Sequence, residues 1–445
     1  HPQVIHNEML QKIEDPELGL TTQVSPPLKF SISKSPKPQP ARYPGEDNSL
    51  FATCIPKDPI PLGKVNQHPL EGIKVVDLTG YIAGAYGTTL LADLGADVLK
   101  IESFAGDGFR QNGAAFQGWN QGKRGMILNL KDPKGLDIFH QLVREADVVT
   151  ENYRGGIAAN LGVDYKSLRK VNPKIIYSTV NGYGLTGPFS EYPAFDPLIQ
   201  AQGGAMKDQG GSGDPVFLRI AASDYSSAIL SAYGIVSALY YRSRHNDGQH
   251  VEISLVNAAF AYQAAEYFNY PDKPTKPRLS SVGQSVDYRL YKAADGWFFL
   301  SCKEDIEWNK MCQAVGMPDL ASQNKESRAE NQDVLNQKLE SLFINSQVSV
   351  WIDIFRKAGV KCAVNKSLRV IHDDPQAHAL GLITENDSYN LGRIKLQGLP
   401  FRFSRTPGKL DLPAPDHGEH TDQVLEELGF LKENIVALRS KRIVG

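Results

Sequence analysis

Cysteine is scarce in this 445-residue chain, and none of its four cysteines belongs to a CxxC pair. Zinc sites and disulfide frameworks need paired or clustered cysteines, so we expect neither, and no metal site of another kind is indicated. Each cysteine is interpreted as a small buried hydrophobic residue or an unreactive surface thiol. Because the chain also opens without a signal-peptide pattern, we expect a cytoplasmic location. The four residues are Cys54, Cys302, Cys312 and Cys362.

Long apolar runs and a strong net charge are missing as well. The most apolar stretch, Ala221 to Tyr241, is interrupted by Ser, Asp, Gly and Tyr, whereas a membrane helix needs about 20 predominantly apolar residues. Lys and Arg number 48 against 50 Asp and Glu, a formal charge of -2. We therefore expect neither a membrane nor a nucleic acid as partner, and a small anionic ligand would need a local basic site.

A dinucleotide-binding fingerprint is the third absence. No G-x-G-x-x-G motif follows the first predicted strand, since Gly80, Gly84 and Gly87 have a different spacing. The sequence therefore does not support an NAD-dependent oxidoreductase.

What the chain does contain is an internal repeat with one fixed offset. Adding 373 to residue numbers near the start gives matching residues near the end, without gaps. Since the chain begins with His1, the economical interpretation is a C-terminal part of a tandem fusion. Residues 1–47 are then the tail of a preceding homologous copy, and 48–68 a linker. The matches are Pro2-Gln3 with Pro375-Gln376, Leu18-Gly19 with Leu391-Gly392, Pro27-Leu28-Lys29-Phe30-Ser31 with Pro400-Phe401-Arg402-Phe403-Ser404, Pro40-Ala41 with Pro413-Ala414, and Gly45-Glu46 with Gly418-Glu419.

Strand and helix patterns alternate through the rest of the chain. Such alternation predicts an α/β fold with a large Rossmann-like parallel sheet over residues 69–270. A long helix is expected from Ser223 to Arg244. Residues 271–375 predict a smaller α+β domain with a hairpin turning at Asp295-Gly296, and residues 376–445 are expected to return to the large domain.

Three glycine-bearing loops and a set of basic residues are candidates for ligand binding. The loops are 151–156, 181–188 and 210–213, and we expect them at consecutive strand ends, where open α/β sheets bind ligands. Taken singly, each is also explained as a tight turn. Basic residues near predicted turns could meet a phosphate-bearing ligand, or could be solvated surface charges. They are Arg110, Lys123, Arg124, Lys131 and Arg154.

Two acids stand in mainly apolar surroundings. Asp196 follows Ala194-Phe195, and Asp224 stands at the start of the predicted long helix. From local sequence alone, Asp224 is explained as a helix N-cap, although a cap and a catalytic role can coexist.

Several short motifs resemble the class III CoA-transferases of the CaiB/BaiF type, the group that contains formyl-CoA transferase, carnitine CoA-transferase and the α-methylacyl-CoA racemases. The resemblance runs from about Pro69 to the C-terminus and includes the opening tail. The motifs are Pro69-Leu70-Glu71-Gly72, Ala92-Asp93-Leu94-Gly95-Ala96-Asp97-Val98, Asn120-Gln121-Gly122-Lys123-Arg124, Ala146-Asp147-Val148-Val149, Asn172-Pro173, Gly182-Tyr183-Gly184, Gly187-Pro188, Phe195-Asp196 and Gly248-Gln249.

The resemblance implies an enzyme that moves coenzyme A between carboxylic acids, with Asp224 as its covalent nucleophile. Coenzyme A is then a substrate, and no permanently bound cofactor is implied. Asp196, Tyr183 and Trp119 are possible secondary site residues. The family's coenzyme A contacts fall on Ala83, Lys131, Asn152 and Tyr153, with Lys123, Arg124 and Arg154 as further phosphate partners.

The resemblance also implies a homologous copy as partner, fused in tandem or in an interlocked dimer. Tandem members include dimethylsulfoniopropionate CoA-transferase/lyases, and an onium cation could bind among Trp119, Tyr183, Phe195 and Tyr225. Ile82 replaces a family glutamine, and the glycine-rich flap is reduced to Gly283-Gln284. Both departures argue against oxalate or formate as substrates.

Two further functions stay open at this point. A racemase would need a histidine immediately before Asp196, where this chain has Phe195, which cannot move protons. The other is a non-catalytic half that supports its partner copy, and the retained Asp224 argues against it.

Overall fold

The computed structural model describes residues 1–33, 38–51, 66–273, 280–388, 391–410 and 412–445. Cys54 therefore lies outside the described residues. The chain divides into two compact units, and each is treated by itself below. Unit 1 comprises residues 1–203, 218–273 and 378–445, and unit 2 comprises residues 204–217 and 274–377.

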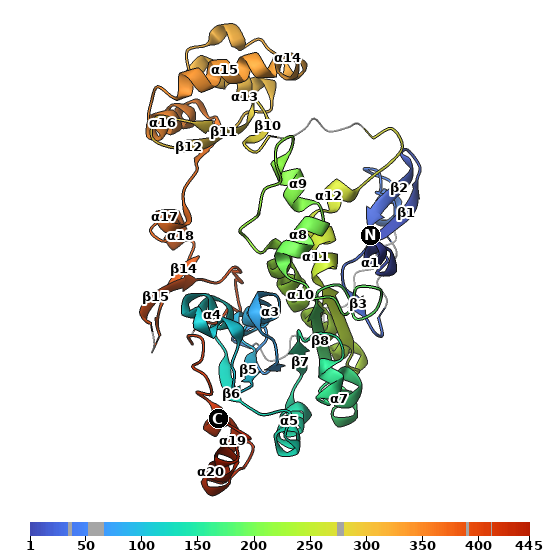
Figure 1. Ribbon diagram of the computed structural model, residues 1–445. Coiled ribbons are helices and arrows are strands. Elements are labelled where there is room, and N and C mark those ends of the chain that lie inside the picture. Colours follow the sequence, from blue (N-terminus) through green and yellow to red (C-terminus); the bar gives the residue numbers. More distant parts are fainter. Residues whose placement is uncertain (34–37, 52–65, 274–279, 389–390, 411) are drawn as a thin grey trace. The chain divides into compact units, whose positions relative to one another are not determined.

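Unit 1 is built, within the described residues, around a seven-stranded sheet that is parallel except for one edge strand (Figure 1). The strand order is β3-β9-β8-β7-β4-β5-β6, so the chain moves outward from β4 to β6 and then returns to β7 beside β4. This reversal is the topological switch point of doubly wound folds. The predicted α/β class with a Rossmann-like sheet is confirmed. The strands are β3 (Lys29–Phe30), β4 (Lys74–Asp77), β5 (Asp97–Glu102), β6 (Arg124–Ile127), β7 (Val148–Glu151), β8 (Ile176–Asn181) and β9 (His250–Ser254).

Helices cover both faces of this sheet. Successive residues of a strand point to opposite faces, so neighbouring valines pack against different helices. Val75 and Val148 pack in a cluster with α3 (Tyr81–Asp93), α10 (Ala222–His245) and α11 (Leu255–Tyr262). Val76 and Val149 pack in a second cluster with α5 (Pro133–Glu145), α7 (Tyr165–Val171), α19 (Thr421–Glu427) and α20 (Lys432–Ser440). The predicted long helix is confirmed as α10. Further helices of this unit are η1 (Gly108–Gln111), α4 (Gly113–Asn120), α6 (Ile157–Asn160), α8 (Asp196–Gln202) and α12 (Ala264–Tyr267).

Helices α3 and α10 approach each other very closely. A Cβ atom at Gly87 of α3 would lie 2.8 Å from the carbonyl oxygen of Ala228 on α10. Glycine at this position therefore lets α10 settle against α3. Among the described helices, none combines the length and the apolar character needed to cross a bilayer.

The two segments of the sequence repeat fold alike and in the same register. Helix α1 (Pro2–His6) precedes a hairpin of β1 (Leu10–Asp15) and β2 (Gly19–Val24). Helix α18 (Pro375–Ala379) precedes a hairpin of β14 (Ile383–Ser388) and β15 (Gly392–Gln397). Each boundary is shifted by the 373 residues found in the sequence. We call residues 1–33 the first tail element and residues 374–406 the second.

Details of the repeat agree as closely as its boundaries. Gly19 and Gly392, at equivalent places in the two hairpins, have φ values of 71° and 66°, which favour glycine. Further on, Glu46 accepts a hydrogen bond from the amide of Tyr43, as Glu419 does from that of Asp416. The likeness continues into α2 (Asn48–Phe51), which begins at the position equivalent to the start of α19, within the segment expected to be a linker.

Unit 2 is a smaller α+β unit with an antiparallel sheet ordered β10-β11-β12-β13. The predicted hairpin is confirmed as β11 and β12, and Cys302 and Cys312 are buried in the core beside it. Residues 204–217, expected in the large domain, belong to this unit. Its elements are α9 (Ala205–Gly210), β10 (Gly283–Ser285), β11 (Tyr288–Lys292), β12 (Trp297–Ser301), α13 (Asp305–Ala314), η2 (Pro318–Leu320), α14 (Lys325–Glu330), α15 (Gln332–Phe343), α16 (Val348–Ala358), β13 (Lys361–Val364) and α17 (Leu368–Ile371).

The loop at residues 210–213 is a correction to the sequence analysis. It follows helix α9, not a strand, and it lies in unit 2. The expectation that it shares a sheet edge with the loops at 151–156 and 181–188 is therefore wrong. Glycine clusters mark tight turns after helices as readily as after strands, so composition alone could not separate the two cases.

Candidate active site

The loops after β4 and β7 meet at the switch point of the sheet. The side-chain oxygen of Asn152 accepts a hydrogen bond from the Gly80 amide at 2.9 Å, and its nitrogen donates to the Gly80 carbonyl at 2.7 Å. Gly80 is the N-cap residue of α3, and Ala83 lies in the first turn of that helix. Three of the predicted coenzyme A contacts, Ala83, Asn152 and Tyr153, therefore lie where doubly wound folds bind their ligands.

Tyr81 stands between Gly80 and the rest of α3 in an unusual backbone conformation. Its φ is 59°, in the left-handed region, and its side chain is exposed. A non-glycine residue pays about 1–3 kcal/mol for such a conformation, and strain of this kind concentrates at ligand-binding turns. The double hydrogen bond from Asn152 to Gly80 helps hold this turn.

Glu151 holds the backbone of Tyr153 in place through a hydrogen bond. Its carboxylate accepts hydrogen bonds from the Tyr153 amide and from the Thr179 hydroxyl, both at 2.7 Å. Burial raises the pKa of Glu151 to about 7, since the two hydrogen bonds only partly replace lost water. Glu151 belongs to the predicted loop 151–156, but its role in holding Tyr153 was not predicted.

Asp224 is the third residue of α10 and does not cap it, because the N-cap residue is Ala221. Its carboxylate is half-buried and, within the described part of the chain, has no hydrogen-bond or ion-pair partner. Burial, and then the negative charge of Asp196, raise the pKa of Asp224 to about 7. Near neutral pH this carboxylate is thus more basic than an ordinary aspartate and is free to attack an electrophile.

Asp196 performs the capping that the sequence suggested for Asp224. One of its carboxylate oxygens accepts a hydrogen bond from the Ser223 amide at 2.7 Å, and the side chain is 4% exposed. The other oxygen accepts from Gln200, which also donates to the Ile220 carbonyl at 3.1 Å. Asp196 therefore positions the start of α10. Gln200 was not predicted, although an amide four residues after Asp196 shares its helix face.

The structure brings together two of the four aromatic residues predicted for an onium site. The Trp119 indole donates a hydrogen bond to the hydroxyl of Tyr225 at 3.0 Å. Tyr225 follows Asp224 in the sequence. Tyr183 instead is buried with its ring centroid 5.6 Å from that of Phe189. Phe195 is the exposed N-cap residue of α8. The four do not form the common aromatic cluster that the sequence suggested.

Lys123 and Arg124 have structural partners in place of the predicted phosphate contacts. The Lys123 side chain is fully buried, and its ammonium donates to Asp77 at 3.0 Å and to Ala85 and Asn120 at 2.9 Å. Arg124 begins β6 and forms ion pairs with Asp97 and Glu427. Arg124 is therefore at the amino end of the sheet, opposite to Asn152. Neither residue is available to the ligand edge, which corrects the two expectations.

The remaining basic candidates differ in their exposure. Arg110 already has partners within the protein. It forms an ion pair with Glu102, and its guanidinium lies 4.1 Å from the ring centroid of Phe116. Lys131 and Arg154 are exposed, and Arg154 follows directly on Tyr153. Among the basic residues of the prediction, Lys131 and Arg154 therefore keep solvent-facing side chains. Across the described residues, no three His, Cys, Asp or Glu side chains gather as a metal site would require.

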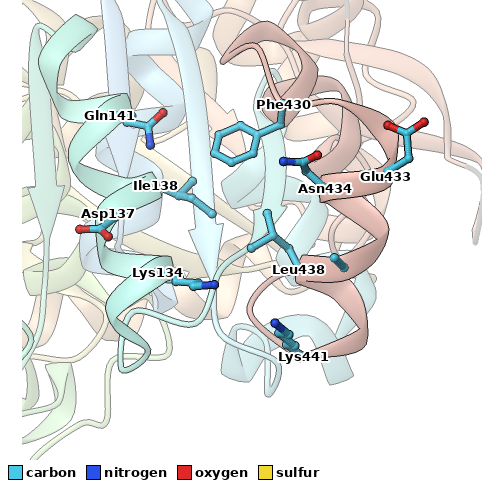
Figure 2. A pocket seen from close by; sticks show the side chains of 10 residues that line it. Lys134, Asp137, Ile138, Gln141, Phe430, Glu433, Asn434, Leu438 and Lys441 are labelled. Atoms are coloured by element: carbon cyan, nitrogen blue, oxygen red, sulfur yellow. The ribbon is translucent and has the colours of Figure 1, made fainter.

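Two pockets in unit 1 do not include Asp224. One of about 520 Å³ lies between α5 and α20, with Ile138, Phe430 and Leu438 on its walls and Lys134 and Lys441 at one end (Figure 2). The other, of about 300 Å³, includes Arg124 at the amino end of the sheet. We therefore place the candidate site at the switch point of the sheet and at the start of α10, outside these two pockets.

Comparison with known proteins places this geometry in a family. The CoA-transferase family III model matches residues 70–421. The chain is 32% identical to a succinate–glutarate CoA-transferase of Agrobacterium fabrum, over 81% of this chain and 96% of that protein. It is 32% identical to an acetyl-CoA:oxalate CoA-transferase of Acetobacter aceti, over 76% and 89% of the two chains. A crystal structure of a CAIB/BAIF family protein from Brucella suis has a TM-score of 0.74 and 31% identity, covering 82% of this chain and all of that one. The chain is therefore an enzyme of CoA-transferase family III.

Proposed function

We propose that this enzyme transfers coenzyme A from an acyl-CoA donor to a carboxylic acid acceptor, with Asp224 as the covalent nucleophile. The observation that carries the proposal is a half-buried carboxylate without a hydrogen-bond partner among the described residues, at the start of α10. Asp196 is held by Ser223 and Gln200 and is not free to attack. An unpaired, more basic carboxylate is suited to attack on a thioester.

The proposed reaction balances without any further reactant. A carboxylate oxygen of Asp224 attacks the thioester carbonyl, the C–S bond breaks, and coenzyme A thiolate leaves an aspartyl–acyl anhydride. The thiolate then attacks the aspartyl carbonyl, which releases the donor acid and forms an aspartyl-CoA thioester. The acceptor carboxylate attacks that thioester, the C–S bond breaks, and an aspartyl–acceptor anhydride forms. The thiolate then attacks the acceptor carbonyl of this anhydride, which forms the acceptor acyl-CoA and releases the Asp224 carboxylate. The donor, the aspartyl-CoA intermediate and the product are all thioesters and are therefore similar in energy, while the two anhydrides between them are short-lived.

Trapping of the intermediate tests this mechanism. After incubation with acetyl-CoA and hydroxylamine, we expect a hydroxamate on Asp224, identified by peptide mass spectrometry. Borohydride should likewise convert the aspartyl thioester to an alcohol. Continued turnover with Asp224 unmodified under both reagents would contradict the proposal.

The acceptor is proposed from the residues beside Asp224. The relatives' names specify succinate, glutarate, oxalate and mesaconate. In this chain Trp119 is hydrogen-bonded to Tyr225, the residue that follows Asp224 on α10, and aromatic faces attract onium cations. We therefore propose two classes of acceptor: a dicarboxylate, and a zwitterionic acid such as dimethylsulfoniopropionate that is cleaved after transfer. Offering both acids together to the aspartyl-CoA intermediate, and measuring which acid becomes the CoA thioester, distinguishes the two acceptors.

Asn152 is expected to support coenzyme A binding through the Gly80 turn. Asn152→Ala removes two hydrogen bonds, each contributing about 1 kcal/mol. The KM for acyl-CoA should therefore rise about 10- to 30-fold, while kcat changes less than about 3-fold, because the lost contacts serve binding in ground and transition states alike. Steady-state kinetics with acyl-CoA as varied substrate measure both.

Asn160→Ala is the matched control for this substitution, because Asn160 is exposed on α6, away from the turn. Its kinetics should equal those of the wild type. A selective fall in kcat in Asn152→Ala, without a change in KM, would assign Asn152 to the chemical step instead.

The alternatives predict other outcomes. A racemase would exchange the α-proton of an acyl-CoA without an acceptor acid, and Phe195 offers no group for that exchange. If this chain were a non-catalytic half that supports a partner copy, replacing Asp224 would leave the activity of that partner unchanged. We further propose that residues 1–47 are the tail of a homologous copy, which is the partner of residues 69–445.

A further inference from the structure

A chain of hydrogen bonds crosses three neighbouring strands of the large sheet and ends at the loop that carries Tyr153. The Glu151 carboxylate on β7 accepts a hydrogen bond from the Thr179 hydroxyl on β8 at 2.7 Å. The same hydroxyl oxygen lies 2.9 Å from Nε2 of His250 on β9. Glu151 is 3% and Thr179 1% exposed, whereas His250 is partly exposed. The chain, which we call the relay, therefore connects a buried carboxylate to a side chain that reaches solvent.

Strand register and aromatic packing hold the relay in place. Glu151 lies opposite Thr179 in the parallel pair of β7 and β8, so their side chains share one face of the sheet. The His250 ring centroid lies 5.4 Å from the ring centroids of both Tyr165 and Tyr177. These two rings keep the imidazole in the orientation that directs Nε2 at Thr179.

The Thr179 hydroxyl can take two orientations, because it has a single proton and can donate and accept at once. When Glu151 is ionised, the hydroxyl donates to the carboxylate, and its oxygen accepts from a His250 that carries its proton on Nε2. When Glu151 is protonated, the carboxyl group donates to the hydroxyl, which turns and donates to an unprotonated Nε2. His250 then carries its proton on Nδ1. The protonation state of Glu151 is thus tied to the tautomer of His250.

Glu151 changes its charge near neutral pH, while its neighbours keep theirs. Burial raises the pKa of Glu151 to about 7. Burial lowers the pKa of His250 and outweighs the opposing effect of Glu252, so the imidazole is mostly neutral at that pH. Burial raises the pKa of Tyr153 to about 12 and also raises that of Tyr177, so both phenols stay protonated. The titratable and charged side chains around the relay are Tyr153, Tyr165, Tyr177, Asp164, Arg169 and Glu252.

We propose that Thr179 and His250 are positioning residues that control the protonation of Glu151 and, through it, how firmly the Tyr153 loop holds coenzyme A. A proton enters at Nδ1 of His250, the Nε2 proton passes to Thr179, and the Thr179 proton passes to Glu151. One proton is gained from solvent, and the intermediate groups each lose one and gain one. The inference rests on the proposed coenzyme A contact of Tyr153.

Protonation of Glu151 loosens the loop. The carboxylate also accepts a hydrogen bond from the Tyr153 amide at 2.7 Å, and an ionised acceptor makes such a bond about twice as strong as a neutral one. As the pH falls through about 7, this acceptor loses its charge and Tyr153 is held less firmly. We therefore expect the Kd for coenzyme A to be about 5-fold higher at pH 6 than at pH 8.

Isothermal titration of the full chain with coenzyme A at these two pH values tests the effect on binding. The ligand's own phosphate titrates in this range, but it contributes equally to every variant. Thr179→Val removes a donor to Glu151, so the carboxyl group should stay protonated and the high Kd should appear at both pH values. Thr179→Ser keeps the hydroxyl and should restore the 5-fold effect.

Ser178→Ala is the matched control, because it removes a buried hydroxyl from the opposite face of β8, where Ser178 lies 3.0 Å from the Ser231 hydroxyl. It should keep the wild-type dependence on pH. A Thr179→Val protein with the full 5-fold effect, or a wild type without any effect beyond that of Glu151→Gln, would overturn the role of the relay in binding.

Nitrogen chemical shifts of His250 test the relay itself, on the wild type and without coenzyme A. In long-range nitrogen–proton correlation spectra of histidine-labelled protein, the signals that His250→Gln removes belong to this ring. They should show the Nε2-protonated tautomer at pH 8 and the Nδ1-protonated tautomer at pH 6. One tautomer throughout, or a charged imidazole at pH 6, would overturn the relay. Trapping at Asp224 is independent of this result, so failure of the relay and failure of the proposed nucleophile are distinguishable.

Discussion

Asp224→Asn is expected to abolish CoA transfer, with a fall in kcat of about 10⁴-fold or more, because an amide cannot form the aspartyl thioester. The measurement is the formation of acceptor acyl-CoA, separated by liquid chromatography. Asp137→Asn is a matched control, since Asp137 is exposed on α5, and it should keep wild-type activity. Transfer at the wild-type rate in Asp224→Asn would support a non-catalytic half and overturn the nucleophile.

The same substitution should make the protein more stable at alkaline pH. Because the folded-state pKa of Asp224 is raised to about 7, the folded protein retains a proton that the unfolded chain releases. The free energy of unfolding therefore falls as pH rises from about 4 to about 7. Removing the ionisable group should raise that free energy by about 2 kcal/mol at pH 8, with little change at pH 4. Urea unfolding at the two pH values measures the difference.

This gain in stability distinguishes a lost nucleophile from a damaged fold. An inactive variant that is also less stable at pH 8 would mean that Asp224 is structural. An inactive and more stable variant is the outcome expected of a residue that the fold keeps in an unfavourable state for function.

Lys123→Met is expected to destabilise unit 1 by about 3–5 kcal/mol, the usual loss when one partner of a buried ion pair is removed. The substitution leaves Asp77 buried without the Lys123 ammonium, which lies 3.0 Å away. Burial alone would raise the pKa of Asp77, and Lys123 followed by Lys100 hold it below its usual value. Urea unfolding at neutral pH, monitored by circular dichroism, measures the loss.

Kinetics of the same variant separate the structural role from the phosphate contact expected from the sequence. Any folded Lys123→Met enzyme should keep its KM for acyl-CoA within about 2-fold, because the side chain has no exposed surface. A lost phosphate contact would raise that KM about 10-fold or more and leave stability nearly unchanged. Lys134→Met, on the exposed side of α5, is the control for loss of a lysine.

Local patterns in the sequence were sufficient for the elements of the fold. The alternating strand and helix patterns predicted the large parallel sheet, and the turn at Asp295-Gly296 predicted the hairpin of unit 2. The repeat predicted two like tail elements, which recur with equal strand registers. These features depend on neighbouring residues, such as a glycine that accepts positive φ, so they can be recognised without the rest of the molecule.

The roles of the two acids could not be obtained in the same way. Asp196 and Asp224 both stand near a helix start, and only the packing of α8 against α10 brings the Asp196 carboxylate to the Ser223 amide, 27 residues away. Asp196 already accepts from that amide, and the Asp224 carboxylate has no hydrogen-bond partner among the described residues. The family resemblance implies Asp224 as nucleophile, and its half-buried carboxylate with a raised pKa supports that proposal.

Sequence patterns were enough to predict the fold class, the family resemblance and the two copies of the tail. Tertiary structure decided which basic residues face the ligand edge, since Lys123 and Arg124 are neighbours with different surroundings, one in the core and one at the amino end of the sheet. It also placed the first tail element against strand β9, while Phe401 and Phe403 of the second stay exposed. The reason is that burial and pairing depend on residues far apart in the chain, whereas a sequence pattern records only local preferences.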